Sequence, residues 1–329
     1  MLRTKHIILF LTLALLGCKE QGVLPIVEPF SPGTLDKLSK APDMGVGSIS
    51  IGVGTELGFA GIGAVGFPPV GGGNNRFYVY NANLKSWELR APLPQPYRYQ
   101  SLTFATSGKL YVLGGYNYFI EKTGPPIQYK AAYYNDVWQY DVLTDKWAKK
   151  NNLPFDSASF QKCVVMNIGN RGFLMLTDKM WEYNEPNDMW ILKQNLPFTT
   201  SNWDGRSFVR SGNYGMISEA TKGYVHSGNS IWEYDTETDK WKQQFSLSPE
   251  SRMLFCLKQK GYYGKDSADN DSTYLWEVDF EKGTTRKKIG FQKAIGAFTY
   301  IGISYALNGK GYFSTEYRSF MQEFFEFTP

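Results

Sequence analysis

The stretch NDVWQYDVLTDKW, residues 135–147, returns as DKMWEYNEPNDMW at 178–190 and as NSIWEYDTETDKW at 229–241. In each copy, two aromatic residues lie two positions apart and therefore share one face of a strand, because side chains alternate along a strand. Polar turn-forming residues follow, and the next strand begins near a second tryptophan. The phrase predicts a β-hairpin, and its repetition predicts a structural unit.

The unit recurs at intervals between 43 and 60 residues. Its first aromatic residue is found at six positions: Tyr78, Trp138, Trp181, Trp232, Trp276 and Phe325. A second hairpin, SLTFATSGKLYVLGG at 101–115, precedes one copy and alternates around Ser107-Gly108. Four strands per unit predict a β-propeller, in which four-stranded sheets stack radially because a lone sheet cannot bury both faces.

The order of these parts resembles the Kelch repeat: a hairpin ending in LYVLGG, a long loop, NDVWQYD, a turn and a tryptophan. The resemblance covers roughly residues 34–329 and is strongest in the second unit. Later units lack the double glycine, as at Thr177-Asp178. The resemblance implies an all-β, six-bladed Kelch-type β-propeller.

The sixth unit supplies three strands before the chain ends, so its fourth strand must come from elsewhere. Residues 34–44, TLDKLSKAPDM, resemble the outermost strand of the first unit, WELRAPLPQP at 87–96. We therefore expect the N-terminal segment to form the outer strand of the C-terminal blade and to close the ring.

The first eighteen residues differ from the rest of the chain. Arg3 and Lys5 precede an apolar run that ends at Cys18, as in a secretory signal. The residues Leu15-Leu16-Gly17-Cys18 resemble the bacterial lipobox, which implies cleavage before Cys18 and lipidation of that residue. The alternative is an ordinary signal peptide with an incidental cysteine.

This interpretation divides the chain into a lipoprotein signal peptide at 1–17, a lipidated cysteine and tether at 18–33, and a propeller at 34–329. By family analogy, Lys19 after the cysteine favours the outer membrane, with the protein facing the periplasm or exposed on the surface. Loss of residues 1–17 lowers the net charge from +4 to +2. Such a near-neutral balance gives no reason to expect nucleic-acid binding.

The longest loop expected at one end of the ring, 116–135, is rich in tyrosine. Loops of this length in compact domains are usually functional or disordered, and amphipathic rings suit contact with a sugar or a protein. The residues singled out for ligand binding are Tyr116, Tyr118 and Tyr133. In the alternative interpretation, the loop packs its rings on a neighbouring blade.

Three arginines are expected at the same end of the ring. Arg98 and Arg252 follow the prolines that end outer strands, and Arg206 lies in the irregular stretch NWDGRSFVR. The Kelch resemblance implies that such arginines line the channel mouth and receive an anionic group. On this hypothesis, alanine at Arg98 or Arg252 would leave the melting temperature nearly unchanged. The alternative is pairing with backbone carbonyls and Asp204.

The sequence limits the chemistry of a site. His226 is the only histidine after the signal segment, so sites with several histidine ligands are excluded, and so are the copper oxidases of the Kelch family. Cys163 and Cys256 lie in apolar runs and are expected to be small buried side chains. We predict no cofactor, no metal and no catalytic residue.

The main functional hypothesis is a lipid-anchored, non-enzymatic binding or scaffold module for a glycan or protein partner. The alternative is a carbohydrate mutarotase resembling the six-bladed Kelch sialic-acid epimerases. That chemistry needs a carboxylate and a cation in the channel mouth. Glu219 and Glu250 are available, although no clear match to the family's acidic–arginine motif is present.

Overall fold

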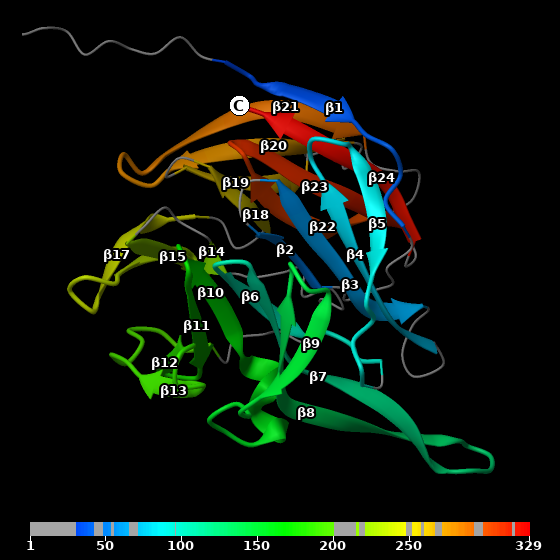
Figure 1. The fold of residues 1–329 in the computed structure, drawn as a ribbon. Helices are drawn as coiled ribbons and strands as arrows, with labels where there is room; N and C mark the ends of the chain where they lie inside the picture. The colour runs from blue at the N-terminus through cyan, green and yellow to red at the C-terminus, as the bar shows by residue number, and fades with distance from the viewer. Residues whose placement is uncertain are drawn as a thin grey trace, which may run out of the picture. The chain divides into compact units, whose positions relative to one another are not determined.

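The computed structural model shows six four-stranded antiparallel sheets, the blades of a propeller (Figure 1). It describes residues 31–42, 49–53, 56–65, 72–95, 97–200, 215–216, 221–247, 252–257, 260–266, 272–292, 299–317 and 320–329. Residues 32–329 form one compact unit. In this described part of the chain, no helix has the length and apolar character needed to cross a membrane.

Each of the first three blades is built from contiguous chain, with its first strand innermost. Blade one contains β2 (Ile49–Val53), β3 (Leu57–Val65), β4 (Gly72–Asn81) and β5 (Ser86–Arg90). Blade two contains β6 (Leu102–Thr106), β7 (Lys109–Lys122), β8 (Gln128–Asp141) and β9 (Lys146–Lys150), and a 3-10 helix, η1 (Ser157–Lys162), follows it. Blade three contains β10 (Val164–Ile168), β11 (Arg171–Leu176), β12 (Lys179–Asn184) and β13 (Met189–Leu192).

The next two blades repeat this order, and the sixth departs from it. Blade four contains β14 (Gly215–Met216), β15 (Lys222–Ser227), β16 (Ser230–Asp235) and β17 (Lys240–Ser246). Blade five contains β18 (Arg252–Leu257), β19 (Lys260–Asp266), β20 (Ser272–Asp279) and β21 (Thr284–Gln292). Blade six contains β22 (Thr299–Leu307), β23 (Lys310–Tyr317), β24 (Phe320–Thr328) and, outermost, β1 (Thr34–Lys37).

The innermost strands close a circle. β2, β6, β10, β14, β18 and β22 contact one another in chain order, and β22 returns to β2. Side chains join some of these neighbours: the Ala105 backbone N–H donates to Asn167 Oδ1 at 2.6 Å, and the Ser304 N–H donates to Ser50 Oγ at 3.1 Å. The six-bladed ring predicted from the repeat is confirmed.

The N-terminal strand closes blade six as predicted. β1 pairs antiparallel with β24, with Thr34 opposite Thr328 and Lys37 opposite Phe325. Beyond the strand, the Leu38 N–H donates to the Phe324 carbonyl at 2.8 Å. In Figure 1 the blue strand at the start of the described chain lies beside the red strand at its end.

The repeated phrase also joins each blade to the one before it. Tyr140 donates its hydroxyl hydrogen to Asp145 Oδ1 at 2.6 Å, and Trp147 packs on the Tyr140 ring with centroids 4.9 Å apart. The Ala91 N–H of blade one donates to Asp145 Oδ1, while Trp147 Nε1 donates to the Ala91 carbonyl. The phrase therefore recurs because it forms a hairpin and an inter-blade contact together.

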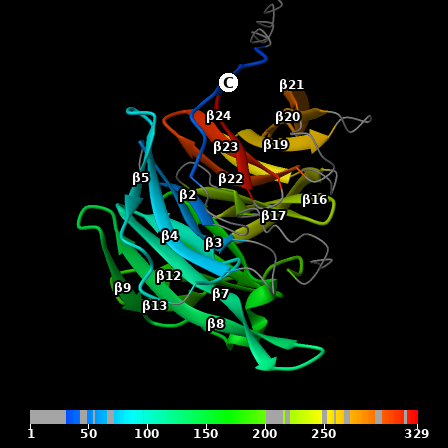
Figure 2. The same ribbon diagram turned by 90° about the vertical axis from the view of Figure 1, so that its right-hand side faces the viewer.

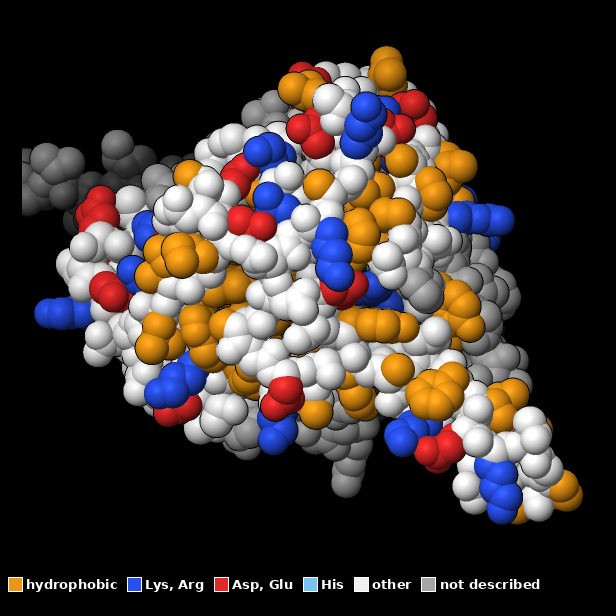
Figure 3. All heavy atoms as spheres, turned by 60° about the horizontal axis from the view of Figure 1, so that its bottom comes forward, with side chains coloured by type: hydrophobic (Ala, Val, Ile, Leu, Met, Phe, Trp, Pro, Cys, Tyr) orange, Lys and Arg blue, Asp and Glu red, His pale blue; other side chains and the backbone are white. Residues whose placement is uncertain are grey.

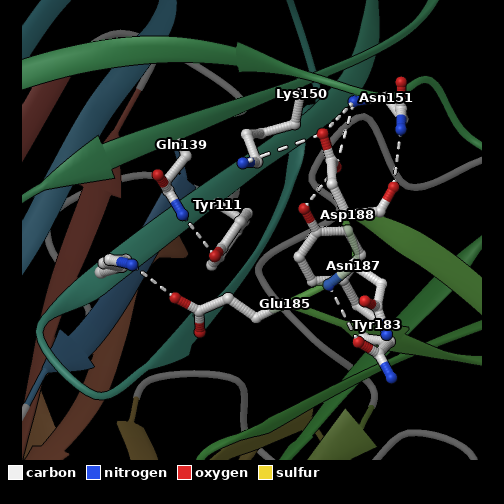
Figure 4. Close-up of polar contacts among 10 residues, drawn as sticks. Tyr111, Gln139, Lys150, Asn151, Tyr183, Glu185, Asn187 and Asp188 are labelled. Atoms are coloured by element: carbon white, nitrogen blue, oxygen red, sulfur yellow. Dashed lines mark hydrogen bonds and ion pairs between the residues drawn. The ribbon is translucent and has the colours of Figure 1, made fainter.

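The third blade repeats the arrangement against the second (Figure 4). Tyr183 donates to Asp188 Oδ1 at 2.7 Å, and Asp188 accepts the backbone N–H of Asn151 at 3.1 Å. In blade four, Tyr234 donates to Asp239 Oδ1 at 2.6 Å. The aspartate seven positions after the first aromatic residue of each of these three phrases therefore has a structural role, because it accepts the hydrogen bond of the tyrosine hydroxyl in its own hairpin.

A glycine allows close packing at several of these interfaces. A Cβ on Gly172 would lie 2.2 Å from the Phe104 ring of the preceding blade, and one on Gly311 would lie 2.1 Å from Phe255. Such distances are shorter than any real carbon–carbon contact, so only glycine fits without a shift of the ring. The pattern Lys/Arg-Gly-aromatic that begins many second strands therefore reflects blade-to-blade distance.

The residue after the first aromatic of the phrase is a buried carboxylate in the last two blades. Glu277 accepts hydrogen bonds from Tyr262 Oη at 2.9 Å and Lys260 Nζ at 3.1 Å. Burial by itself raises the pKa of Glu326, but hydrogen bonds from Lys310 Nζ at 2.6 Å and Tyr312 Oη at 2.7 Å outweigh it, so that pKa is lowered. In both blades, these hydrogen bonds favour the charged form of the buried carboxylate.

We expect acid to destabilise the ring through these carboxylates. Because the folded-state pKa of Glu326 is lowered, its contribution is complete above the unfolded-state pKa of about 4.3 and is lost as pH falls through the folded-state value. Thermal melts from neutral pH to acid should show a smaller fall in melting temperature for Glu326→Gln than for the parent. Glu121→Gln, at an exposed carboxylate, is the matched control; equal slopes in all three proteins would contradict the assignment.

Candidate binding face

Arg98, between β5 and β6, lies at the base of the long β7–β8 hairpin. Its guanidinium binds both oxygens of Asp136, with Nη1 2.6 Å from Oδ1 and Nη2 3.0 Å from Oδ2. Nη1 also donates to the Gly114 carbonyl at 2.9 Å, and the Tyr134 ring covers the guanidinium at 4.6 Å. The Arg98 side chain has 0% exposed surface. Its charge is therefore neutralised inside its own blade.

Two glycines turn the second strand away from the ring at this point. Gly114 and Gly115 have φ values of +48° and +100°, which side chains with a Cβ rarely adopt. A Cβ on Gly115 would lie 2.8 Å from the Tyr99 carbonyl oxygen. The close approach lets Tyr99 and Tyr116 exchange backbone hydrogen bonds at 2.7 and 3.0 Å. The double glycine of the LYVLGG motif thus sets the direction in which the hairpin leaves the blade.

Beyond these glycines the chain forms an antiparallel ribbon, residues 116–134, that projects from the propeller (Figure 2). The sequence predicted a loop at 116–135, and that prediction is wrong. Tyr116 pairs with Tyr133, and the ladder continues to Lys122 opposite Gln128. Residues 119–128 are all exposed, including Phe119 and Ile127. The alternative that the segment packs its rings on a neighbouring blade is also wrong, because these residues are exposed to solvent.

Four tyrosines meet where the ribbon leaves the blade. The Tyr99 and Tyr116 rings stack with centroids 5.5 Å apart, and Tyr118 lies edge-on to Tyr116 at 5.5 Å. Tyr133 lies across the ladder from Tyr116, also at 5.5 Å. Tyr99 is buried, whereas the other three rings are partly exposed. We call these four residues the tyrosine platform.

The buried member of the platform supports the others. Burial raises the pKa of Tyr99, and the neighbouring phenols of Tyr97 and Tyr118 raise it further. The hydroxyl therefore stays protonated at neutral pH and remains a hydrogen-bond donor. The platform as a whole offers ring faces and neutral hydroxyl groups. Figure 3 shows hydrophobic side chains gathered at the base of the projecting ribbon and along it.

Comparison with known protein families identifies a Kelch motif in the second blade. Residues 98–154, which run from Arg98 through the ribbon and the phrase, match the Kelch motif. The chain is a six-bladed β-propeller that carries a Kelch motif. A search of curated proteins found no match to the sequence.

One solved structure similar to the Kelch-motif propeller is titled "Structure of YjhT". The two chains align with a TM-score of 0.57 and 13% sequence identity, over 89% of this chain and 95% of the other. At that identity the likeness concerns the fold alone. The near-complete coverage of both chains indicates that they share the whole ring rather than a few blades.

The other residues predicted for ligand binding lie apart from the platform or outside the described residues. Arg252 begins β18, the inner strand of blade five, and its side chain is not described. Arg206, Glu219, Glu250 and the lipidation residue Cys18 all lie outside the described residues. Among the predicted residues, the structure brings Tyr116, Tyr118 and Tyr133 together. Arg98 is buried against Tyr134 at the base of the same ribbon, and Arg252 lies in another blade.

The histidine and the two cysteines of the Kelch-motif propeller are not part of the platform. His226 is buried in β15, with Nε2 3.3 Å from the Leu247 carbonyl oxygen. Cys163 and Cys256 are free thiols, and burial raises the pKa of Cys256. Within the described ranges, no group of three His, Cys, Asp or Glu side chains is placed to hold a metal ion.

Sequence reasoning missed Asp136, the partner that neutralises Arg98. A signal was present, because the corresponding positions in the next two phrases are Lys179 and Ser230. An acidic residue found at this position in one copy, in the same unit as Arg98, indicates an ion pair particular to that blade. The predicted alternative of ordinary pairing describes Arg98 best, although its partner is Asp136 and not Asp204.

Proposed function

We propose that this Kelch-motif propeller is a carbohydrate-binding module of the cell envelope, and that its ligand rests on the tyrosine platform. The observation that carries the proposal is the convergence of Tyr99, Tyr116, Tyr118 and Tyr133, with three rings partly exposed. Phenol rings offer an apolar face and a polar tip, which match the C–H face and hydroxyl rim of a pyranose. No catalytic group is needed for this role.

The rigidity of the platform supports a binding role. Arg98, Asp136 and the two glycines fix the base of the ribbon, and Tyr99 is held by two backbone hydrogen bonds. Rings that are already in place lose little conformational entropy when a ligand arrives. Binding groups mounted on a rigid scaffold are the usual arrangement in propellers and other all-β folds.

The test is a glycan array probed with residues 22–329, followed by titration of any retained glycan. Tyr116→Ala and Tyr133→Ala should each weaken binding roughly tenfold, since a ring contact of about 1.4 kcal/mol corresponds to that factor. Tyr274→Ala, at a partly exposed tyrosine of blade five, is the matched control and should bind as the parent does. If both platform variants bind the glycan as tightly as the parent does, the platform is not the binding site. If the parent instead captures an outer-membrane protein and the platform variants do not, the ligand is a protein and not a glycan.

A second candidate, a carbohydrate mutarotase, is favoured by the ring itself. The sequence resembles the six-bladed Kelch sialic-acid epimerases, and the propeller has six blades with near-complete overlap with YjhT. Catalysis would need a carboxylate and a cation facing the sugar. NMR of free sugar anomers decides between the two functions: faster exchange at catalytic protein concentration supports the enzyme, and binding without faster exchange supports the module.

The proposal places the protein at the outer membrane through lipid on Cys18, with residues 18–33 as the tether. The support is the sequence pattern alone, Leu15 to Cys18 after a basic and apolar leader. We expect Cys18→Ser to abolish incorporation of labelled palmitate and to move the protein to the soluble fraction. Unchanged labelling in that variant would contradict the anchor and leave the binding proposal untouched.

A further inference from the structure

The two faces of the ribbon differ in charge. Residues two apart on a strand, and residues paired directly across a ladder, share a face. The pairs Tyr116–Tyr133, Tyr118–Ala131 and Ile120–Tyr129 therefore form one face, which we call the tyrosine face. It carries no lysine, arginine, aspartate or glutamate over these three pairs.

Two charged residues of the ribbon, Lys130 and Glu121, lie on the opposite face, and Lys122 follows a bulge near the tip, beyond the three pairs of the tyrosine face. Phe119 pairs with Lys130, and Lys130 Nζ lies 3.1 Å from Glu121 Oε1 in an exposed ion pair. Tyr134, whose ring covers Arg98, shares this face, because it is adjacent to Tyr133 in the same strand. The Arg98 charge is therefore buried, paired with Asp136, and separated from the tyrosine face by the ribbon.

The tyrosine face is also longer than one sugar ring. Its three pairs span four residue steps along β7, about 13 Å at 3.3 Å per residue. The aromatic rings Tyr116 and Tyr133 lie at its base, Tyr118 in its middle and Tyr129 near its tip, where Ile120 is 52% exposed. Ala131 leaves the edge of the Tyr118 ring without a bulky neighbour across the ladder.

We propose that the ligand of this face is an uncharged oligosaccharide that lies along the ribbon. The inference rests on the proposed function and narrows it to a substrate class. Stacking and hydroxyl hydrogen bonds supply the contacts, and the three described pairs of this face contain no cation that could receive a carboxylate. An acidic sugar would gain nothing here and would lose hydration of its charge.

The experiment uses two series of probes. Lactose and 3′-sialyllactose test the effect of charge, and neutral oligosaccharides of one to five residues test the effect of length. Affinity for neutral probes should rise over the first two or three residues and then level off. It should change less than about twofold between 0.01 M and 1 M salt, a range over which the screening length falls from about 30 to 3 Å. Sialylated probes should bind no tighter than neutral ones.

Two adjacent aromatic residues locate the ligand. Tyr118→Ala removes a ring from the tyrosine face and should weaken neutral-probe binding roughly tenfold. Phe119→Ala removes a ring of similar size from the opposite face and should leave binding unchanged. Circular dichroism and thermal melts of both variants confirm that the ribbon remains folded.

The outcomes separate this inference from the proposed function. Salt-sensitive preference for sialylated probes, weakened by Tyr116→Ala, would overturn the uncharged ligand and keep the carbohydrate-binding module. Equal losses in Tyr118→Ala and Phe119→Ala would overturn the assignment to one face. Failure of the parent to bind any neutral or acidic glycan would reject both proposals.

Discussion

Arg98→Ala should destabilise the propeller by about 3–5 kcal/mol, because it leaves Asp136 without its partner in a largely buried position. The variant also loses the hydrogen bond to the Gly114 carbonyl and the packing against Tyr134. Typical domains are stable by only about 5–15 kcal/mol, so a loss of this size is readily measured. Chemical denaturation followed by tryptophan fluorescence gives the free energy of unfolding directly.

A double-mutant cycle shows whether the ion pair is the cause. Asp136→Ala alone should be strongly destabilising, and the double variant Arg98→Ala/Asp136→Ala should cost less than the two single changes together. Lys130→Ala breaks an exposed ion pair on the same hairpin and should cost less than about 1 kcal/mol. A loss below 1 kcal/mol in Arg98→Ala would contradict the structural role and restore the channel-mouth hypothesis.

Deletion of residues 34–44 should have the other large effect, because it removes β1 from blade six. Its ladder with β24 is lost, and so is the partial burial of Leu35 and Leu38 against the cores on either side of the blade. Each such side chain contributes up to about 1.5–3 kcal/mol when fully buried. The exposed edge of β24 would then be free to pair with other chains, so we expect aggregation or a much lower melting temperature.

Deletion of residues 19–30 is the control for that experiment. It shortens the segment before β1 and leaves every described β1 contact intact, so the protein should melt as the parent does. Light scattering during the melt distinguishes aggregation from simple unfolding. Equal stability of the two deletions would mean that β1 contributes nothing to closure, despite its register with β24.

The ring could be predicted from the sequence because the residues of the phrase around Trp138 contact one another and the preceding blade. The tyrosine, the turn aspartate and the second tryptophan bond to one another and to the preceding blade, so their spacing cannot vary without breaking the interface. Closure by 34–44 was predictable for a related reason: a blade with three strands leaves an edge that some other segment must cover.

The ribbon was missed because local and family signals disagreed. YNYFIEK and IQYKAAYY both have strand propensity, and the turn residues are confined to TGPP between them. The Kelch pattern, however, places a loop at this position, and that expectation outweighed the local one. The burial of Arg98 could not be predicted from the sequence, because it depends on tertiary contacts with Asp136 and with the Gly114 carbonyl.

Closure by β1 also governs the order in which the protein can fold. Blades one to five are each built from contiguous chain and can form as that chain emerges. Blade six needs both ends, because Thr34 pairs with Thr328. Pairing between such distant segments is slow, since a long loop must close before any contact is gained. Until β24 has been synthesised, β1 has no partner strand, so blade six cannot be completed before that point.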